Sequence, residues 1–315
     1  MRIWNLPVTD YRPFSAIEEQ RDVVVVMSEP AWTAVSSHLS HLSITSVVEA
    51  RDATISHWDT LLPQCHGDVV YAVGGGLAVD AAKYIAVKQN KPLVCLPTAL
   101  SVDAFLTWAS GYRHDGCVYY LETKPPDALI IDLAVLAAAP TAVRAAGICD
   151  LLSIATGCWD WQFAHEQGQN PAHAPFIPYV YQAAQAILQG SLDCAEAAGR
   201  GDPDGLKQLL DCLALEVQLC NQIGHSRPEE GSEHYFAYAV ENVMGKGLPH
   251  GDLVGPGIVL MAEKQGQDTA PLLRALDACH IPLGNIPETA VIQTLSILPT
   301  YVRQHRLPYG IAHQL

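Results

Sequence analysis

Apolar and polar positions divide the chain into two halves with different patterns. In the first half, short apolar runs alternate with helical stretches, as expected of strands that are buried on both faces of a sheet. The expected strands are Val23–Met27, Ser46–Val48, Asp68–Val73, Pro92–Leu96 and Ala128–Ile131, and the expected helices are Trp32–Leu42, Asp59–Cys65 and Leu77–Lys88. This alternation predicts a mainly parallel sheet in a doubly wound α/β layer. A hairpin is expected at Tyr112–Glu122, around a turn at His114-Asp115-Gly116.

The strand pattern ends near Pro140, and long helices rich in alanine and leucine follow. They are expected at Thr141–Ala164, Pro175–Ala197, Asp204–Gly224, Ala270–Cys279 and Glu288–Arg303. Between the third and fourth of these helices, a further helical run ends at Gly245 and Gly247, and an apolar helix spans Leu253–Ala262. We therefore predict an α/β domain at residues 1–139 and an all-α domain at residues 140–315.

Composition limits the classes of partner. The 315 residues carry 33 acidic and 18 basic side chains, and the net charge of −15 argues against nucleic acid as the main ligand. No segment approaches the roughly 18 consecutive apolar residues of a membrane span, and the N-terminus lacks the features of a signal peptide. The nine cysteines are scattered and include no C-x-x-C pair, which indicates reduced thiols in a cytoplasmic protein. The apolar helical surface favours a homo-oligomer.

Two histidines suggest a metal site. His234, Tyr238 and Glu241 recur at helical spacing and would share one face. His250 follows a glycine-rich turn and opens the next helix, so the two imidazoles could bind one ion together with an acidic residue. Asp150, which lies in an apolar run, is the best candidate for that residue because a buried carboxylate needs a partner. Each histidine taken alone is more simply explained as an ordinary buried residue.

A second chemical feature is the strand–glycine–helix unit around Gly74-Gly75-Gly76. Glycines allow a ligand to approach the backbone, and the following helix offers free N–H groups to a phosphate. Asp80 and Lys83 lie three residues apart in that helix and can form an ion pair. The pattern matches neither G-x-G-x-x-G nor a Walker loop, and a plain tight turn explains it about as well.

Polar residues also follow the next strand, at the sheet edge where open α/β folds place ligands. Thr98, Ser101 and Asp103 could hydrogen-bond a ligand there, although helix capping is the simpler explanation. Arg227 could bind a phosphate in a bidentate manner, or cap the preceding helix instead.

Taken in order, these motifs resemble the superfamily of dehydroquinate synthase, glycerol dehydrogenase and iron-containing alcohol dehydrogenases. The resemblance extends over most of the chain and is carried by GGGLAVDAAK, LPTALSVDA, AAGICDLLS, EEGSEHYFAYAVE and LPHGDLVGPGIVLMA. Within the superfamily, KPPDALIIDLAVL, GICDLLSIATGCWDW and HSRPEEGSEHYF are most similar to the sn-glycerol-1-phosphate dehydrogenase family. This resemblance implies a Rossmann-like α/β domain joined to a helical domain.

The resemblance also implies an activity, a metal and a cofactor. The family reduces dihydroxyacetone phosphate with NADH or NADPH, in a step of phospholipid biosynthesis, and uses zinc bound by Asp, His and His. By motif position, the ligands fall on Asp150, His234 and His250. The pyrophosphate loop falls on Gly74, Gly75, Gly76 and Asp80, with Thr98 and Ser101 near the nicotinamide and Asp103 near the substrate or cofactor. Ligand types also permit Fe²⁺ or Ni²⁺.

Three departures from the family pattern stand out. Four residues after His234, the family usually has a second histidine that is thought to help proton transfer, and this chain has Tyr238. The family's His-Gly-Glu turn and Gly-Val-Gly become His250-Gly251-Asp252 and Gly255-Pro256-Gly257. The chain is also shorter than is usual for the family.

The expected mechanism is metal-assisted hydride transfer in a cleft between the two domains. Zinc stabilises the alkoxide that develops on the substrate, and a metal-bound water, Tyr238 or His225 supplies the proton. Arg227 and Lys83 are candidates for holding a substrate phosphate. Glu29 follows the first predicted strand, where an acidic residue favours a free ribose hydroxyl and therefore NAD.

Three alternatives remain open at this point. One is a sugar-phosphate cyclase like dehydroquinate synthase, which uses NAD transiently and usually has Glu at the position of Asp150. Another is a dehydrogenase for a different small polyol or alcohol, which Tyr238 makes credible. The third is a non-catalytic relative, against which the three intact ligand positions argue.

Overall fold

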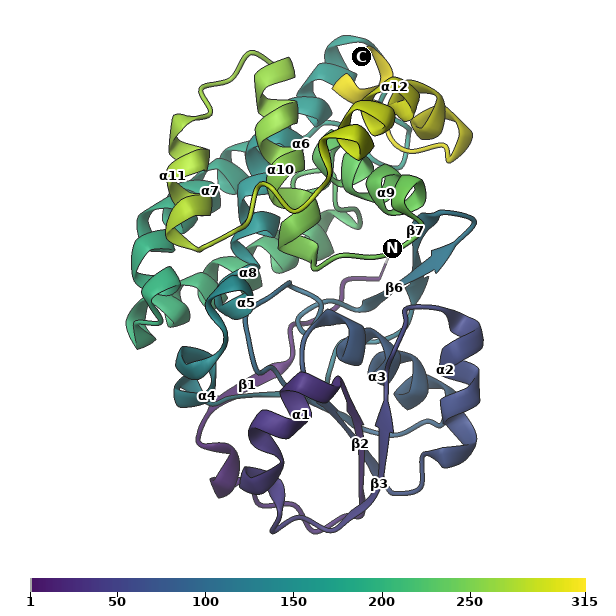
Figure 1. Cartoon of the computed structure of the whole chain (residues 1–315), viewed down its shortest axis with the longest axis vertical. Helices are drawn as coiled ribbons and strands as arrows, with labels where there is room; N and C mark the ends of the chain where they lie inside the picture. The colour runs from purple at the N-terminus through teal and green to yellow at the C-terminus, as the bar shows by residue number, and fades with distance from the viewer. Residues whose placement is uncertain (1) are drawn as a thin grey trace. The chain divides into compact units, whose positions relative to one another are not determined.

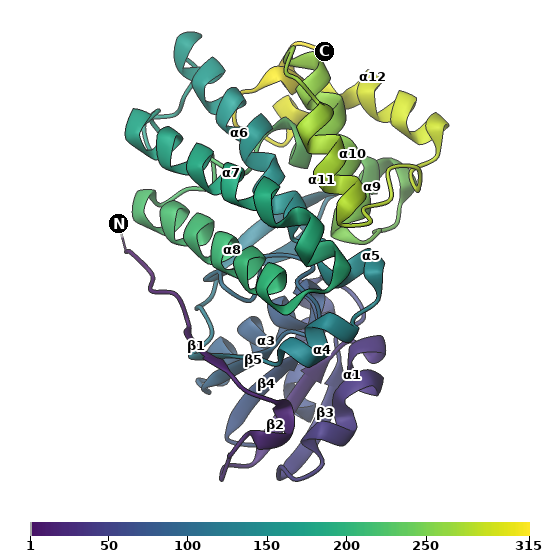
Figure 2. The same cartoon turned by 90° about the vertical axis from the view of Figure 1, so that its left-hand side faces the viewer.

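A computed structural model describes residues 2–315 and divides the chain into two compact units. The α/β unit comprises residues 4–114 and 118–140, and the helical unit comprises residues 2–3, 115–117 and 141–315. Figures 1 and 2 show residues 4–114 of the α/β unit in purple to blue and residues 141–315 of the helical unit in teal to yellow. The expected fold class, a mainly parallel sheet with helices followed by an all-α region, is confirmed.

The sheet of the α/β unit has the strand order β1-β8-β5-β4-β2-β3, and neighbouring strands are parallel. Its strands are β1 (Val8–Tyr11), β2 (Val23–Met27), β3 (Ile44–Glu49), β4 (Val69–Val73), β5 (Leu93–Leu96) and β8 (Ala128–Ile131). The central strands β4 and β5 are buried throughout. Buried parallel strands are uniformly apolar because helices cover both faces of the sheet, which explains why these strands were predicted almost to the residue.

One strand was missed. β1 is short, mostly exposed and half polar, and it lies at the edge of the sheet beside β8. Its pairing joins residues about 120 positions apart, such as Val8 with Ala128, and a local pattern does not reveal such a contact.

The helices of this unit are α1 (Glu29–Val35), α2 (Ile55–Leu61), α3 (Gly76–Lys88) and α4 (Leu133–Ala138). The first two begin earlier and end sooner than predicted, and each continues as a short 3₁₀ turn, Ser36–Leu39 after α1 and Leu62–Gln64 after α2. The earlier start of α2 follows from Thr54, whose hydroxyl accepts a hydrogen bond from the backbone N–H of His57.

The predicted hairpin is confirmed as β6 (Ala109–His114) and β7 (Cys117–Glu122). Asp115 and Gly116 both adopt positive φ, 48° and 72°, as the favoured two-residue hairpin turn requires.

The helical unit contains α5 (Thr141–Arg144), α6 (Ile148–Glu166), α7 (Pro178–Arg200), α8 (Pro203–Ile223), α9 (Ser232–Met244), α10 (His250–Lys264), α11 (Ala270–Ala278) and α12 (Glu288–Gln304). One prediction was wrong in detail, because the single helix expected at Thr141–Ala164 is interrupted at residues 145–147. The prediction that His250 opens the next helix is confirmed, and the apolar run expected at Leu253–Ala262 lies within α10. Figure 2 shows α7 and α8 packed side by side, joined by a turn in which Gly201 adopts φ 78°. No helix within residues 2–315 is long and apolar enough to cross a membrane.

Candidate functional site

Three helices of the helical unit bring the predicted metal-binding residues together. Asp150 lies in the first turn of α6, His234 in the first turn of α9, and His250 is the first residue of α10. His250 Nε2 lies 2.6 Å from Asp150 Oδ1, and His234 Nε2 lies 3.9 Å from the same oxygen. One ligand atom from each residue falls within 4.8 Å of the others. Asp150 and His234 are buried and His250 is half-buried.

Glu233 fixes the orientation of His234. Its Oε1 lies 2.9 Å from His234 Nδ1 and also accepts a 2.6 Å hydrogen bond from the N–H of Gly231. Nδ1 is therefore engaged, and Nε2 is the nitrogen left to face Asp150. Burial opposes the charged imidazolium, but the hydrogen bond and the charges of Glu233, Glu230 and Asp150 raise the pKa of His234 to about 9. Sequence reasoning gave Glu233 no role because it precedes His234 directly and lies off the face that carries His234 and Tyr238.

The donor set fits a divalent metal such as zinc. Two imidazole nitrogens and one carboxylate oxygen make a typical set of three protein ligands for catalytic zinc, which leaves a coordination position for substrate. The Glu233 carboxylate behind His234 repeats the carboxylate–histidine arrangement that supports metal-binding histidines in many proteins.

Close packing of α9 on α10 holds the two histidines near each other. A Cβ atom on Gly257 would lie 2.6 Å from the carbonyl oxygen of Glu233, so only glycine permits this approach.

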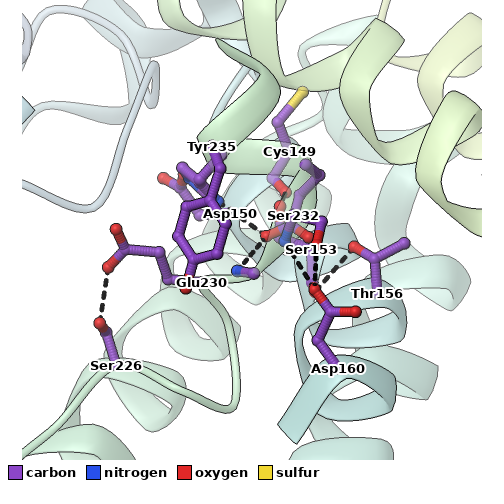
Figure 3. Close-up of polar contacts among 12 residues, drawn as sticks. Cys149, Asp150, Ser153, Thr156, Asp160, Ser226, Glu230, Ser232 and Tyr235 are labelled. Carbon is purple, nitrogen blue, oxygen red and sulfur yellow. Dashed lines mark hydrogen bonds and ion pairs between the residues drawn. The ribbon is translucent and has the colours of Figure 1, made fainter. Parts of the chain in front are cut away.

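A buried carboxylate ties α6 to the start of α9. Asp160 Oδ2 accepts hydrogen bonds from the backbone N–H and the hydroxyl of Ser232, as Figure 3 shows. Asp160 Oδ1 accepts from the N–H of Ile311 and from Gln265 Nε2. Burial raises the pKa of Asp160 to about 6 despite these donors. Asp160 therefore fixes the helix that carries Asp150 against the helix that carries His234.

Tyr238, the residue that departs from the family pattern, points to a carboxylate. Its hydroxyl donates a 2.7 Å hydrogen bond to Glu230 Oε1, and the hydroxyl of Ser226 donates a 2.6 Å bond to Glu230 Oε2. Figure 3 shows the Ser226–Glu230 pair. The ring centroid of Tyr238 lies 6.2 Å from that of His234. Sequence reasoning missed Glu230, because it lies in the loop before α9 and its contact with Tyr238 depends on how that loop folds against the helix.

His225, the other candidate proton donor, packs edge-on against Trp161. Burial, followed by the charge of Arg227, lowers the pKa of His225 to about 4. Its imidazole is therefore neutral near pH 7 and poorly suited to donate a proton as an imidazolium ion. Its role in proton transfer stays a prediction.

In the α/β unit, the three glycines form the turn from β4 into α3. Gly74 adopts φ 139°, and a Cβ on Gly75 or Gly76 would lie 2.7 Å from Ser101 Oγ or 2.9 Å from Val102 Cγ1. The glycine turn therefore packs directly against the loop after β5, which also holds the half-buried Thr98 and Asp103. This cradle, which side chains would fill, fits the pyrophosphate of a dinucleotide at the N-terminus of α3.

Other residues of this unit that were assigned to ligands have protein partners. Lys83 is fully buried, forms a 3.0 Å ion pair with Asp80 and donates to the carbonyl of Ala104 and the hydroxyl of Thr107. Burial raises the pKa of Asp80, and Lys83 opposes this shift.

Glu29 is exposed at the first position of α1, directly after Ser28, which contacts the glycine turn.

Arg227, in the helical unit, is also buried. Its guanidinium donates to the hydroxyl of Tyr235 and to the carbonyl of Tyr309, at 3.2 and 2.8 Å. Because Lys83 and Arg227 are both engaged within the protein, their assignment to a substrate phosphate stays a prediction.

Comparison with known proteins gives consistent matches. A family model for iron-containing alcohol dehydrogenase matches residues 14–140. The chain is 31% identical to glycerol-1-phosphate dehydrogenase [NAD(P)+] of Sulfurisphaera tokodaii over 263 residues, which cover 81% of this chain and 73% of that protein. It is 28% identical to the enzyme of the same name from Aeropyrum pernix, over 90% of this chain and 83% of the relative.

Solved structures agree on the fold. Glycerol dehydrogenase from Schizosaccharomyces pombe superposes with a TM-score of 0.69 at 22% identity, over 100% of this chain and 86% of that structure. A 1,3-propanediol oxidoreductase superposes with a TM-score of 0.65 at 15% identity, over 96% and 93% of the two chains.

Proposed function

This chain belongs to the glycerol-1-phosphate dehydrogenase family of iron-containing alcohol dehydrogenases, and we propose on that basis that it reduces dihydroxyacetone phosphate to sn-glycerol 1-phosphate. It is an NAD(P)-dependent alcohol dehydrogenase that uses a divalent metal. The observation that carries the proposal is the convergence of one carboxylate and two imidazoles in a chain that is 31% identical to such an enzyme.

We assign the metal to Asp150, His234 and His250. When bound there, the metal supplies a Lewis acid that stabilises negative charge on the substrate oxygen during reduction. Glu233 keeps His234 in the orientation that presents Nε2 to the ion. Asp160 holds α6 against the start of α9, so that the carboxylate of Asp150 and the imidazole of His234 remain close together.

Tyr238 is the best candidate for the proton donor among the side chains near the metal ligands. Its hydroxyl is held by Glu230, whose second oxygen is held by Ser226. These hydrogen bonds fix the position of the hydroxyl, and its proton would have to leave the bond to Glu230 in order to be transferred to the substrate oxygen. His225 and Asp103 are weaker candidates, the first because its imidazole is neutral near pH 7.

The nicotinamide cofactor is assigned to the α/β unit. Its pyrophosphate would bind the N–H groups of Gly74–Gly76 and the first turn of α3, and Thr98 and Ser101 would face the nicotinamide side. Glu29 favours the ribose hydroxyls of NAD over the 2′-phosphate of NADP, because a carboxylate accepts from hydroxyls and repels phosphate. Equal rates with NADH and NADPH would contradict this preference.

A second candidate, a dehydrogenase for an unphosphorylated polyol, is favoured by two observations. Lys83 and Arg227 are engaged with protein groups, and Glu230 places a carboxylate beside Tyr238. A phosphate needs cationic or N–H partners, so a neutral triol would suit these surroundings better. The cytoplasmic location and the homo-oligomeric state of the enzyme stay predictions.

The test is the oxidation of NADH and NADPH in the presence of dihydroxyacetone phosphate, before and after chelation and after return of Zn²⁺. Turnover that is lost on chelation, restored by zinc and absent in Asp150→Ala would support both the reaction and the metal site. If the protein binds metal but does not turn over dihydroxyacetone phosphate, glycerol and other polyols with NAD⁺ are tested next. Activity with these alone would replace the phosphorylated substrate by the polyol.

A further inference from the structure

A second group of metal-ligating side chains lies in the helical unit and shares no residue with Asp150, His234 and His250. Glu216 and Cys220 are one turn apart on α8, so they project from the same face of that helix. Glu229 comes from the loop between α8 and α9. One ligand atom from each of these three residues lies within 4.8 Å of the other two, and Cys220 Sγ lies 3.4 Å from Glu216 Oε1.

Glu216 is buried without full compensation. Its side chain is 1% exposed, and its Oε2 has no hydrogen-bond partner among the residues that the structure describes. A buried carboxylate oxygen that lacks a partner carries a large desolvation cost. Neighbouring Glu230 provides a contrast, because both of its oxygens accept hydrogen bonds. Burial raises the pKa of Glu216 to about 7, and the hydrogen bonds with Glu229 and Cys220 oppose this shift only in part.

The loop prevents Glu229 from moving away from Glu216. The backbone N–H groups of Glu229 and Glu230 both donate to the carbonyl of Ser226, at 3.0 and 2.8 Å. The loop also presses against α6, because a Cβ on Gly157 would lie 3.1 Å from the carbonyl carbon of Glu229. The fold therefore holds two carboxyl groups together, and either a shared proton or a cation must offset their repulsion.

We propose that Glu216, Cys220 and Glu229 form a second metal site, which takes zinc or a similar thiophilic divalent cation. The cysteine determines the class of ion, because thiolate ligands select zinc over magnesium and calcium. On binding, the thiol proton of Cys220 and any proton between the carboxyl groups are released to solvent, and the ion would be held by the thiolate and by one oxygen of each glutamate. This proposal does not depend on the substrate of the enzyme.

The second ion would fix the loop that carries Glu230. Cys220 and Glu216 belong to α8, and Glu229 is the neighbour of the residue that holds Tyr238. A metal bond from α8 to Glu229 would thus restrain Glu230 and, through it, the hydroxyl of Tyr238. The expected role of the second site is to support the position of Tyr238. Removal of the second ion should loosen the loop between α8 and α9 before it affects the site formed by Asp150, His234 and His250.

Cobalt substitution separates the two sites by spectroscopy. Co²⁺ on Asp150, His234 and His250 has only oxygen and nitrogen ligands, whereas Co²⁺ on the second site has a thiolate and gives a thiolate-to-metal charge-transfer band in the near ultraviolet. We expect this band in the wild-type chain and in His250→Ala, and its loss in Cys220→Ser. Cys212→Ser, which alters the other cysteine of α8, is the matched control and should keep the band.

Metal analysis provides the second measurement. The wild-type chain should bind one equivalent of Zn²⁺ more than Cys220→Ser or the nearly isosteric Glu216→Gln, and His250→Ala should lose the other equivalent. Circular dichroism verifies that each variant is folded, and two independent variants guard against misfolding of one. Absence of the band in folded wild-type protein, or a band that survives Cys220→Ser, overturns the proposal. The two carboxyl groups would then be held together by a shared proton.

Discussion

Glu233 determines which nitrogen of His234 can bind a metal. Because its carboxylate is buried and bonded to Nδ1, removing the negative charge weakens both the orientation and the basicity of the imidazole. We expect Glu233→Gln to lower the affinity for Zn²⁺ by roughly ten- to a hundredfold, as measured by competition with a coloured chelator. Glu263→Gln, on the exposed side of α10, should leave the affinity unchanged. Equal Zn²⁺ affinities in the wild-type protein and in both variants would show that Glu233 does not support His234 as a metal ligand.

Tyr238 can be tested separately from the metal. Tyr238→Phe removes only the hydroxyl, so metal content should be unchanged and stability should fall by about 1 kcal/mol for the lost hydrogen bond to Glu230. If the hydroxyl donates the proton, kcat should fall by about 10²–10⁴-fold, and the limb of the pH–rate profile that belongs to the donor should disappear. Tyr238→His should restore part of the rate and move that limb toward neutral pH. A wild-type rate in Tyr238→Phe would leave the tyrosine a structural role only.

The candidate site illustrates what single residues reveal in a sequence. The pair of histidines and an aspartate in an apolar run suggested a metal site, and the resemblance of the surrounding motifs to the family assigned Asp150, His234 and His250 as its ligands. Their donor atoms do converge, and their ligation stays a prediction. Glu230 and Glu233 were not selected, because the contacts that matter depend on how a loop and a helix face each other in three dimensions.

At the scale of elements, the spacing between α9 and α10 sets the distance between the two histidines. Gly257→Ala would place a Cβ atom 2.6 Å from the carbonyl of Glu233 and push the helices apart. Overpacking of this kind costs about 1–3 kcal/mol, and it should also weaken Zn²⁺ binding because His250 moves with α10. Chemical denaturation and chelator competition measure the two effects.

Gly284→Ala is the control for this substitution. A Cβ on Gly284 meets no heavy atom within 4 Å, so the change should alter stability by less than about 0.5 kcal/mol. If both variants behave alike, close helix packing does not hold the histidines together.

The elements themselves differ in how well local sequence predicts them. β2 and β8 were predicted to the residue because valine and isoleucine fill strands that are buried on both faces. Helix ends were predicted less well, since they depend on caps such as Thr54 and on breaks such as residues 145–147. α10 begins at His250 and continues through Pro256, although proline is usually taken as a sign that a helix ends.

For the whole molecule, the order of strands and helices was sufficient to predict an α/β unit followed by a helical unit. Each unit has its own core, and that of the α/β unit includes Val23, Tyr71 and Leu96. The strand order was not predictable, because the pairing of β1 with β8 joins distant parts of the chain. Two cores in one chain have a thermodynamic consequence, since each unit can respond separately to its own ligand.

We expect zinc and NADH to stabilise different thermal transitions. The assigned metal ligands all lie in the helical unit, and the glycine turn lies in the α/β unit. A ligand at a hundred times its Kd stabilises the folded state by about 2.7 kcal/mol, which corresponds to a rise in Tm of roughly 5–10 °C for units of this size. Differential scanning calorimetry of the chelated protein, with each ligand added alone, provides the measurement.

The variants make this test specific. In Asp150→Ala, the shift caused by Zn²⁺ should shrink while the shift caused by NADH remains. A single transition that moves equally with either ligand would mean that the two units unfold as one. In that case, binding at either site stabilises the whole chain, because each ligand adds its binding free energy to the same unfolding transition.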